Sequence, residues 1–434
     1  MQQERKSWRV PFFTIWGGQA FSLFGSQLAQ FALVWWLTET TGSATVLAMA
    51  TFVALLPQIF LGPVMGALVD RWNRRVAMIV ADGFIALVGI WLAYLFWSDA
   101  LQIWHVYLAM FARALGGAVH WPAMQASTSL LVPKKELARV GGLNQTLYGL
   151  LSITAPPLGA LLMEWLPLHS IMLIDVATAA LAIAPLLFIQ IPQPRRTGEQ
   201  LAATSLWGDM RVGFQYIWGW PGALAICLLA MALNFFVSPA MRLLPILVQQ
   251  HFLGGAMQLG WLNAAWGVGM LCGGLWLSFW GGTSKRILTG LGGIVGLGTG
   301  ILIVGLAPAT WLLMALIGLF LGAVMNALSN GVLIAMLQEM VELEMQGRVF
   351  AVVGSLTAAM TPLGMLIAGP VADAIGARPI FIIAGVAQIV LGLGSFFVPV
   401  IMQIEENQRP VLGKDGEEHA VAESLAFGEG LKAE

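Results

Sequence analysis

The stretch Gly66-Ala67-Leu68-Val69-Asp70-Arg71-Trp72-Asn73-Arg74-Arg75 places four charged residues between two long apolar runs. The run before it, residues 45–69, contains no charged residue, and the run after it, residues 76–97, contains only Asp82. Each run has the roughly 20 mostly apolar residues that a helix needs to cross a bilayer. The stretch therefore predicts a short polar connection between two transmembrane helices.

The same alternation of apolar runs and polar islands extends along the chain. Of the 434 residues, 58% are hydrophobic and 10% are charged, whereas soluble domains carry about 25% charged residues. The runs are also too long and too uniformly apolar for the strands of a membrane barrel. We predict an all-α membrane protein with twelve transmembrane helices in two six-helix pseudo-repeats, at residues 12–38, 45–69, 76–97, 103–130, 140–163, 168–190, 222–248, 258–281, 287–307, 311–337, 349–372 and 379–402.

The basic residues give an independent test of this count. Lys and Arg favour the cytoplasmic connections of membrane proteins. If the N-terminus is cytoplasmic, only Arg378 of the 21 basic residues lies in a connection on the outer side, and Arg113 and Arg242 lie inside spans. The other 18 lie at the N-terminus, after even-numbered spans or in the C-terminal tail. We therefore expect a multi-pass protein of the cell (inner or plasma) membrane with both termini in the cytoplasm.

A polar stretch divides the chain into two halves. Residues 191–221 separate an N-terminal six-helix half, 1–190, from a C-terminal half, 222–402. This stretch is either a plain cytoplasmic linker or a linker that contains an amphipathic helix near residues 207–220. The acidic segment 403–434 is predicted to be a disordered cytoplasmic tail.

The stretch around Asp70 also resembles the loop signature of the major facilitator superfamily, Gly-x-x-x-Asp-Arg-x-Gly-x/Arg-Arg, in which the ninth position is either any residue or Arg, with Asn73 in place of the usual Gly. We expect Asn73 to keep the turn, because Asn tolerates left-handed backbone. Arg113-Ala114-Leu115-Gly116-Gly117 resembles the Arg-x-x-x-Gly segment of the same superfamily. Two further segments are similar to its macrolide-efflux and enterobactin-exporter subgroup: Gln346-Gly347-Arg348-Val349-Phe350 and Gly369-Pro370-Val371-Ala372-Asp373.

This resemblance implies a secondary active transporter that works by alternating access, with export and proton exchange favoured. It also implies that the Asp70 connection latches one conformation against the other half, with Arg348 as our candidate partner. The alternative is that its arginines only set the topology. The predicted latch residues are Gly66, Asp70, Arg71, Arg74, Arg75 and Arg348.

Polar residues inside the spans are the candidates for binding and coupling, because charges in a bilayer are costly and usually face the bundle interior. The resemblance places Arg113 and Arg242 on cavity-lining spans. The resemblance places Asp82 and Asp175 on peripheral spans, where structural hydrogen bonding is the favoured interpretation and a role as proton sites is the alternative. His120 is either titratable or a satisfied core histidine. We predict that five polar residues either line the cavity or form interhelical contacts, and that Trp266 provides an aromatic wall. The polar residues are Gln27, Gln30, Asn234, Asn326 and Asn330.

Three hypotheses for the function follow. The leading one is proton-coupled efflux of amphipathic, drug-like small molecules of the macrolide type. The second is export or flipping of a siderophore or lysophospholipid, and the third is a membrane sensor that transports nothing. No HExxH, Gly-x-Ser-x-Gly or Walker motif is present, so we expect neither an enzyme nor an ATP-driven pump. We predict no cofactor, metal or nucleic-acid partner, and a monomer in the lipid bilayer.

Overall fold

A computed structural model describes residues 8–69, 72–191 and 206–405, and every regular element in these ranges is a helix. The first group comprises α2 (Arg9–Thr41), α3 (Ala44–Val69), α4 (Arg74–Trp97), α5 (Ile103–Leu131), the short η1 (Lys134–Glu136), α6 (Leu137–Trp165) and α7 (Leu168–Phe188). After α8 (Leu206–Trp218), the second group comprises α9 (Pro221–Arg242), α10 (Leu244–Gln250), α11 (Ala256–Trp280), α12 (Arg286–Leu306), α13 (Leu312–Met340), α14 (Leu343–Ile375), α15 (Ala377–Ser395) and α16 (Pro399–Met402).

Each predicted span corresponds to one long helix within the described residues. Ten of these helices are long and apolar enough to cross a membrane, and α3 adds a shorter apolar stretch, Ala44–Gln58. The seventh and twelfth predicted spans are broken, because α9 ends before Leu243 and α15 ends at Ser395. A proline explains each break, since Pro245 and Pro399 lack an N–H and their rings crowd the carbonyl four residues earlier. The predicted linker contains α8, and residues 406–434 of the predicted tail lie outside the described part.

Asn73 begins α4 in a different way from the one expected. Its φ is −67°, so its backbone is not left-handed. Its side-chain oxygen instead accepts hydrogen bonds from the backbone N–H groups of Arg75 and Val76, at 3.1 and 3.4 Å. Asn is among the best residues at this capping position. The substitution for Gly therefore preserves the start of the helix by capping it.

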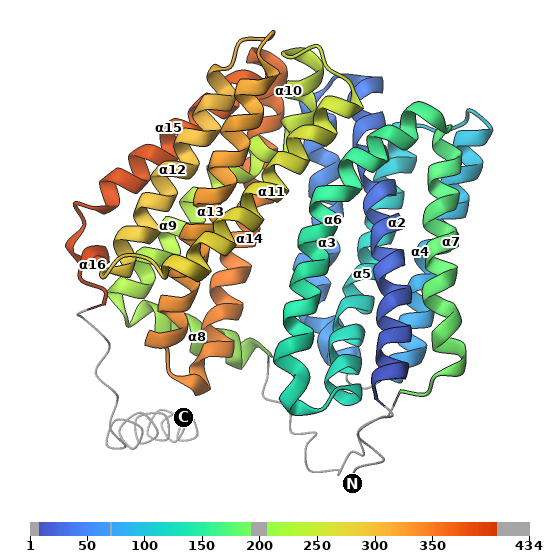
Figure 1. Cartoon of the computed structure of the whole chain (residues 1–434), viewed down its shortest axis with the longest axis horizontal. Coiled ribbons are helices and arrows are strands. Elements are labelled where there is room, and N and C mark those ends of the chain that lie inside the picture. The colour runs from blue at the N-terminus through green and yellow to red at the C-terminus, as the bar shows by residue number, and fades with distance from the viewer. Residues whose placement is uncertain (1–7, 70–71, 192–205, 406–434) are drawn as a thin grey trace, which may run out of the picture.

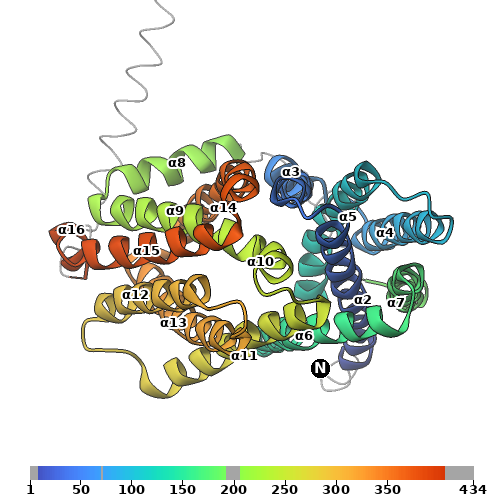
Figure 2. The same ribbon diagram turned by 90° about the horizontal axis from the view of Figure 1, so that it is seen from above.

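The helices form two groups that lie side by side (Figures 1 and 2). Helices α2 to α7 pack on one another, as do α9 and α11 to α15, and α8 packs on α14. Between the groups, α6 packs on α11 and α3 packs on α14. We call the end of the molecule at which α8 lies the α8 end, and the opposite end the α10 end.

The two groups share an apolar core at the α10 end. One cluster of buried side chains joins Phe31 and Ala48 of the first group to Leu243 and Met365 of the second. Toward the α8 end the buried clusters belong to one group or the other. The ribbons correspondingly lie together at the α10 end and diverge toward the α8 end (Figure 1).

Glycines bring α12 and α13 into close contact. A Cβ on Gly300 would lie 2.5 Å from the carbonyl oxygen of Gly318, so only Gly fits there. Gly296 faces Met325 with similar tightness, but Gly292 faces open space. Gly292, Gly296 and Gly300 are spaced four residues apart in α12, and two of the three therefore allow close helix packing.

Candidate substrate cavity between the halves

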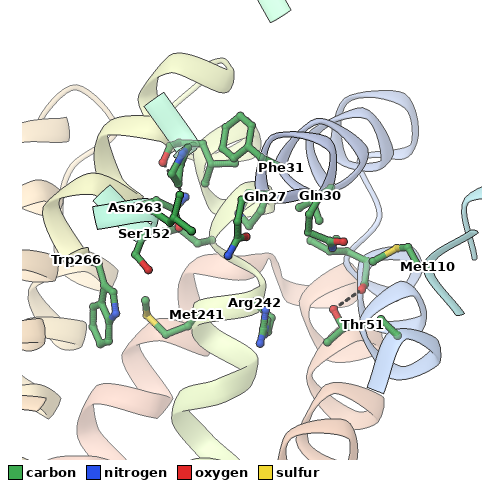
Figure 3. A pocket seen from close by; sticks show the side chains of 18 of the residues that line it. Gln27, Gln30, Phe31, Thr51, Met110, Ser152, Met241, Arg242, Asn263 and Trp266 are labelled. Carbon is green, nitrogen blue, oxygen red and sulfur yellow. Dashed lines mark hydrogen bonds between the residues drawn. The ribbon is translucent and has the colours of Figure 1, made fainter. Parts of the chain in front are cut away.

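A cavity of about 350 Å³ lies where the two groups meet (Figure 3). It is lined by α2, α3, α5 and α6 from the first group and by α9, α10 and α11 from the second. The lining side chains include Gln27, Gln30, Phe31, Thr51, Met110, Ser152, Met241, Arg242, Asn263 and Trp266. Apolar walls with a few convergent polar groups are typical of small-molecule sites.

Arg242 is the one charged side chain among the described residues that line this cavity. It is the last residue of α9, where the break before α10 leaves it exposed to the cavity. The negative end of the helix dipole favours a cation at this position. Within the described residues no carboxylate forms an ion pair with it. The Arg242 guanidinium therefore gives the cavity a fixed positive charge.

The predicted cavity residues divide between two cavities. Gln27, Gln30, Arg242 and Trp266 line the central cavity, and Figure 3 shows Gln27 and Arg242 pointing into the same space. Asn234, Asn326 and Asn330 line a second cavity of about 270 Å³ in the C-terminal group, and Trp266 lines both. Sequence spacing alone does not distinguish the two locations.

Arg113 lies elsewhere, inside the N-terminal group. Its guanidinium is 2.5 Å from the carboxylate of Asp175, and both side chains are almost fully buried. The other oxygen of this carboxylate accepts a hydrogen bond from Ser26 at 2.9 Å. The ion pair joins α5 to α7, and Ser26 adds α2. Arg113 is not among the described residues that line the central cavity.

A second buried carboxylate, Asp82 of α4, lies near this pair. It accepts a hydrogen bond from Gln19 of α2 at 3.0 Å, and Nε2 of His120 on α5 lies 3.4 Å from its other oxygen. Nε2 has no hydrogen-bond partner among the described residues. Gln19 and His120 also line a small cavity of about 40 Å³. Asp82 and His120 thus form a buried acid–base pair beside a space that is large enough for water.

Only part of the predicted latch can be described. Asp70 and Arg71 lie outside the described residues, and Gly66 belongs to the last turns of α3. Arg75 donates hydrogen bonds to the carbonyl oxygens of Leu186 and Leu187 at the end of α7. Arg74 is buried at the start of α4, and Arg348 lies in the first turns of α14 near Met345. Contact between Asp70 and Arg348 stays a prediction.

The contact that joins the groups at the α10 end was not predicted. Asp373, near the end of α14, accepts hydrogen bonds at the start of α3 from Ser43 Oγ at 2.9 Å and from the backbone N–H groups of Ala44 and Thr45 at 2.6 and 3.0 Å. The side chain of Gln250 donates to the carbonyl oxygen of Gly42 at 2.7 Å. A signal was present, because Gly369-x-x-x-Asp373 repeats the spacing of Gly66-x-x-x-Asp70.

Comparison with known proteins identifies the relatives of this chain. The family profile of the Major Facilitator Superfamily matches residues 15–330 and 224–429. Macrolide efflux protein A of Streptococcus pyogenes is 32% identical over 404 residues, covering 93% of this chain and 99% of the relative. The multidrug efflux pump Tap of Mycolicibacterium fortuitum is 22% identical, covering 89% and 95%.

Solved structures show the same fold at low sequence identity. A bacterial homologue of the lysosomal transporter Spinster, in an inward-facing and unoccupied conformation, has a TM-score of 0.70 at 12% identity, covering 94% of this chain and 100% of the other. The nucleoside transporter NupG (D323A mutant) has a TM-score of 0.67 at 12% identity, covering 89% and 98%.

Proposed function

Because the chain belongs to the major facilitator superfamily, we propose that it exports amphipathic small molecules of the macrolide type in exchange for protons, by alternating access. It is a multi-pass efflux transporter, not an enzyme. The proposal adds two points to this: the cargo is a compound of the macrolide type, and protons are exchanged for it. The central cavity carries it, because its walls combine apolar side chains with a few neutral amides and the single cation Arg242 among the described lining residues, which suits a large amphipathic ligand.

The contacts between the groups support alternating access. Asp373, Gln250 and the shared apolar core hold the α10 end together. Opening this end requires those contacts to break while new ones form at the α8 end. The two halves would then alternate between two packed arrangements, one closed at the α10 end and one closed at the α8 end.

The α8 end is the proposed cytoplasmic side. Arg9, Arg75, Lys134 and Arg286 all begin or precede helices at this end, and basic residues favour the cytoplasmic face. Both termini would then lie in the cytoplasm, and substrate would enter the cavity from there. One chain supplies both walls of the cavity, which favours a monomer as the working unit.

Asp82 is the better of the two candidate proton carriers. Asp175 is held in an ion pair with the permanent charge of Arg113 at 2.5 Å. Asp82 has no Lys or Arg partner among the described residues; it contacts the amide of Gln19 and the imidazole of His120 instead. Protonation of Asp82 would weaken its link to His120 and so loosen α4 from α5.

Proteoliposomes with the α8 end outside test both parts of the proposal. A radiolabelled macrolide should accumulate when the lumen is more acidic than the bath, and accumulation should stop when the gradient collapses. Asp82→Asn should abolish accumulation but retain exchange of labelled for unlabelled macrolide. Glu164→Gln, at an exposed carboxylate at the end of α6, is the matched control and should behave as the wild type. Gradient-driven accumulation in Asp82→Asn would exclude this carboxylate, and accumulation without a gradient would exclude proton exchange.

A further inference from the structure

The second cavity, in the C-terminal group, contains more hydrogen-bonding groups than helix packing requires. It is lined by α9, α11, α12, α13 and α15, and its polar side chains are Asn234, Asn326, Ser329, Asn330 and Gln388. None of the described residues that line it is charged. Polar groups in a membrane-embedded interior are costly unless they are satisfied or functional. Asn234 is satisfied within α9, because its side-chain nitrogen donates to the carbonyl oxygen of Ala230 at 3.0 Å and its oxygen accepts from Ser238 Oγ at 3.5 Å.

The amide groups are only partly satisfied by the protein. Asn330 donates to the side-chain oxygen of Asn326 at 2.8 Å, which leaves its own oxygen without a donor among the described residues. Asn326 donates only to the sulfur of Met270 at 3.4 Å, and a thioether is a weak acceptor. One unused hydrogen-bond donor, on Asn326, and one unused acceptor, on Asn330, thus lie on two adjacent turns of α13.

Gln388 adds a buried acceptor beneath this pair. Its side-chain nitrogen donates to the carbonyl oxygen of Leu233 at 3.2 Å, which fixes the orientation of the amide. Its oxygen is buried and has no hydrogen-bond partner among the described residues. Such an orphaned polar atom is rare in folded proteins and calls for a reason. A ligand that donates a hydrogen bond here, directly or through water, would supply one.

These features select the chemistry of the ligand. Because none of the described lining residues is charged, the lining offers hydrogen bonds and no ion pair to a ligand. Unused donors and acceptors together match hydroxyl groups, each of which both donates and accepts. The indole of Trp266 provides a flat apolar wall on one side, and aliphatic side chains such as Leu297 and Leu333 provide the others. A neutral ring that carries several hydroxyl groups combines polar edges with an apolar face and fits this lining.

Trp266 borders both this cavity and the central one. The two volumes, about 350 and 270 Å³, together fall in the range of ~300–1,000 Å³ typical of drug-sized ligands. We infer that the second cavity is a subsite for a neutral, hydroxylated sugar ring of the substrate, whose apolar body occupies the central cavity. The inference rests on the proposed function and specifies its cargo as glycosylated compounds.

Equilibrium binding to purified protein in lipid nanodiscs tests the inference with two probes, a glycosylated macrolide and its sugar-free aglycone. Asn330→Leu removes the accessible amide and should weaken binding of the glycosylated compound about five- to thirty-fold, the effect of one or two hydrogen bonds. Binding of the aglycone should stay within about twofold of the wild type. Gln388→Leu should give the same selective loss, and the aglycone serves as the internal control for folding.

The possible failures are distinguishable. Equal loss for both probes, or no loss for either, would mean that the amides only hold helices together, and would overturn the subsite. If the wild type binds neither probe, the macrolide assignment fails instead. Saturation-transfer NMR with phenyl β-glucoside then decides the subsite alone: a signal that Asn330→Leu abolishes supports it, and no signal in the wild type rejects it.

Discussion

Removal of the Asp373 carboxylate should open the α10 end. In the structure this side chain from α14 accepts three hydrogen bonds at the start of α3, two of them from backbone N–H groups. It acts as a helix cap supplied by the other half of the protein. Replacing a capping side chain by Ala costs about 0.5–2 kcal/mol. Because the carboxylate is exposed, we take about 1 kcal/mol, in the lower part of that range.

This cost applies to one conformation only. The three hydrogen bonds exist while the halves are joined at the α10 end, and they must break when that end opens. Asp373→Ala should therefore shift the equilibrium toward the open state about fivefold, since 1.4 kcal/mol corresponds to a factor of ten. If the open state holds about 1% of the population, it should rise to about 5%.

Cysteine reactivity measures such a small population. In a variant that lacks Cys227 and Cys272, Ala48→Cys places a thiol at the interface, where Ala48 is buried against Gly369. Its rate of modification by a membrane-impermeant maleimide should report the open fraction and rise about fivefold in Asp373→Ala.

Asp99→Asn, at an exposed carboxylate at the same end, should leave the rate unchanged. An unchanged rate in Asp373→Ala, with an unchanged melting temperature, would refute the capping argument.

Three further outcomes are expected. Asp175→Asn leaves the Arg113 charge buried without its partner, so the unfolding free energy should fall by about 3–5 kcal/mol, and Arg113→Met in the same chain should restore much of it, as thermal unfolding would show. Arg242→Met removes the fixed positive charge of the central cavity, so a protonated amphiphilic amine should bind about fivefold more tightly while a neutral analogue is unaffected in equilibrium binding. Gly300→Ala should destabilise the protein by about 1–3 kcal/mol because the new methyl group meets backbone atoms, whereas Gly292→Ala, on the open face of the same helix, should be tolerated.

The helices were predictable because bilayer thickness fixes their length and leaves a strong signal in the sequence. The breaks at Leu243 and before Pro399 were not predicted, although their prolines were visible, because a proline in a membrane helix either kinks or ends it depending on its neighbours. Asn73 was expected to bend the chain and instead caps α4. In each case the surroundings of the residue determined the outcome.

The candidate site was less predictable than the fold. The polar residues inside the spans were identifiable, because they are rare in an apolar chain. Their partners were not, since Arg113 and Asp175 are separated by 62 positions and a span alone does not reveal which face meets which neighbour. The same limitation placed Asn330 with Gln27 in a single predicted set, although they line different cavities.

The buried pairs Arg113–Asp175 and His120–Asp82 both lie in the N-terminal half, whereas the polar side chains that line the second cavity are neutral. Exchanging one amide for another small polar or apolar side chain disturbs no buried charge, so such mutations carry a low stability cost. Drug pressure would accordingly select variants in α9, α13 and α15, and the range of exported compounds would evolve there while the buried ion pairs of the N-terminal half stay constant.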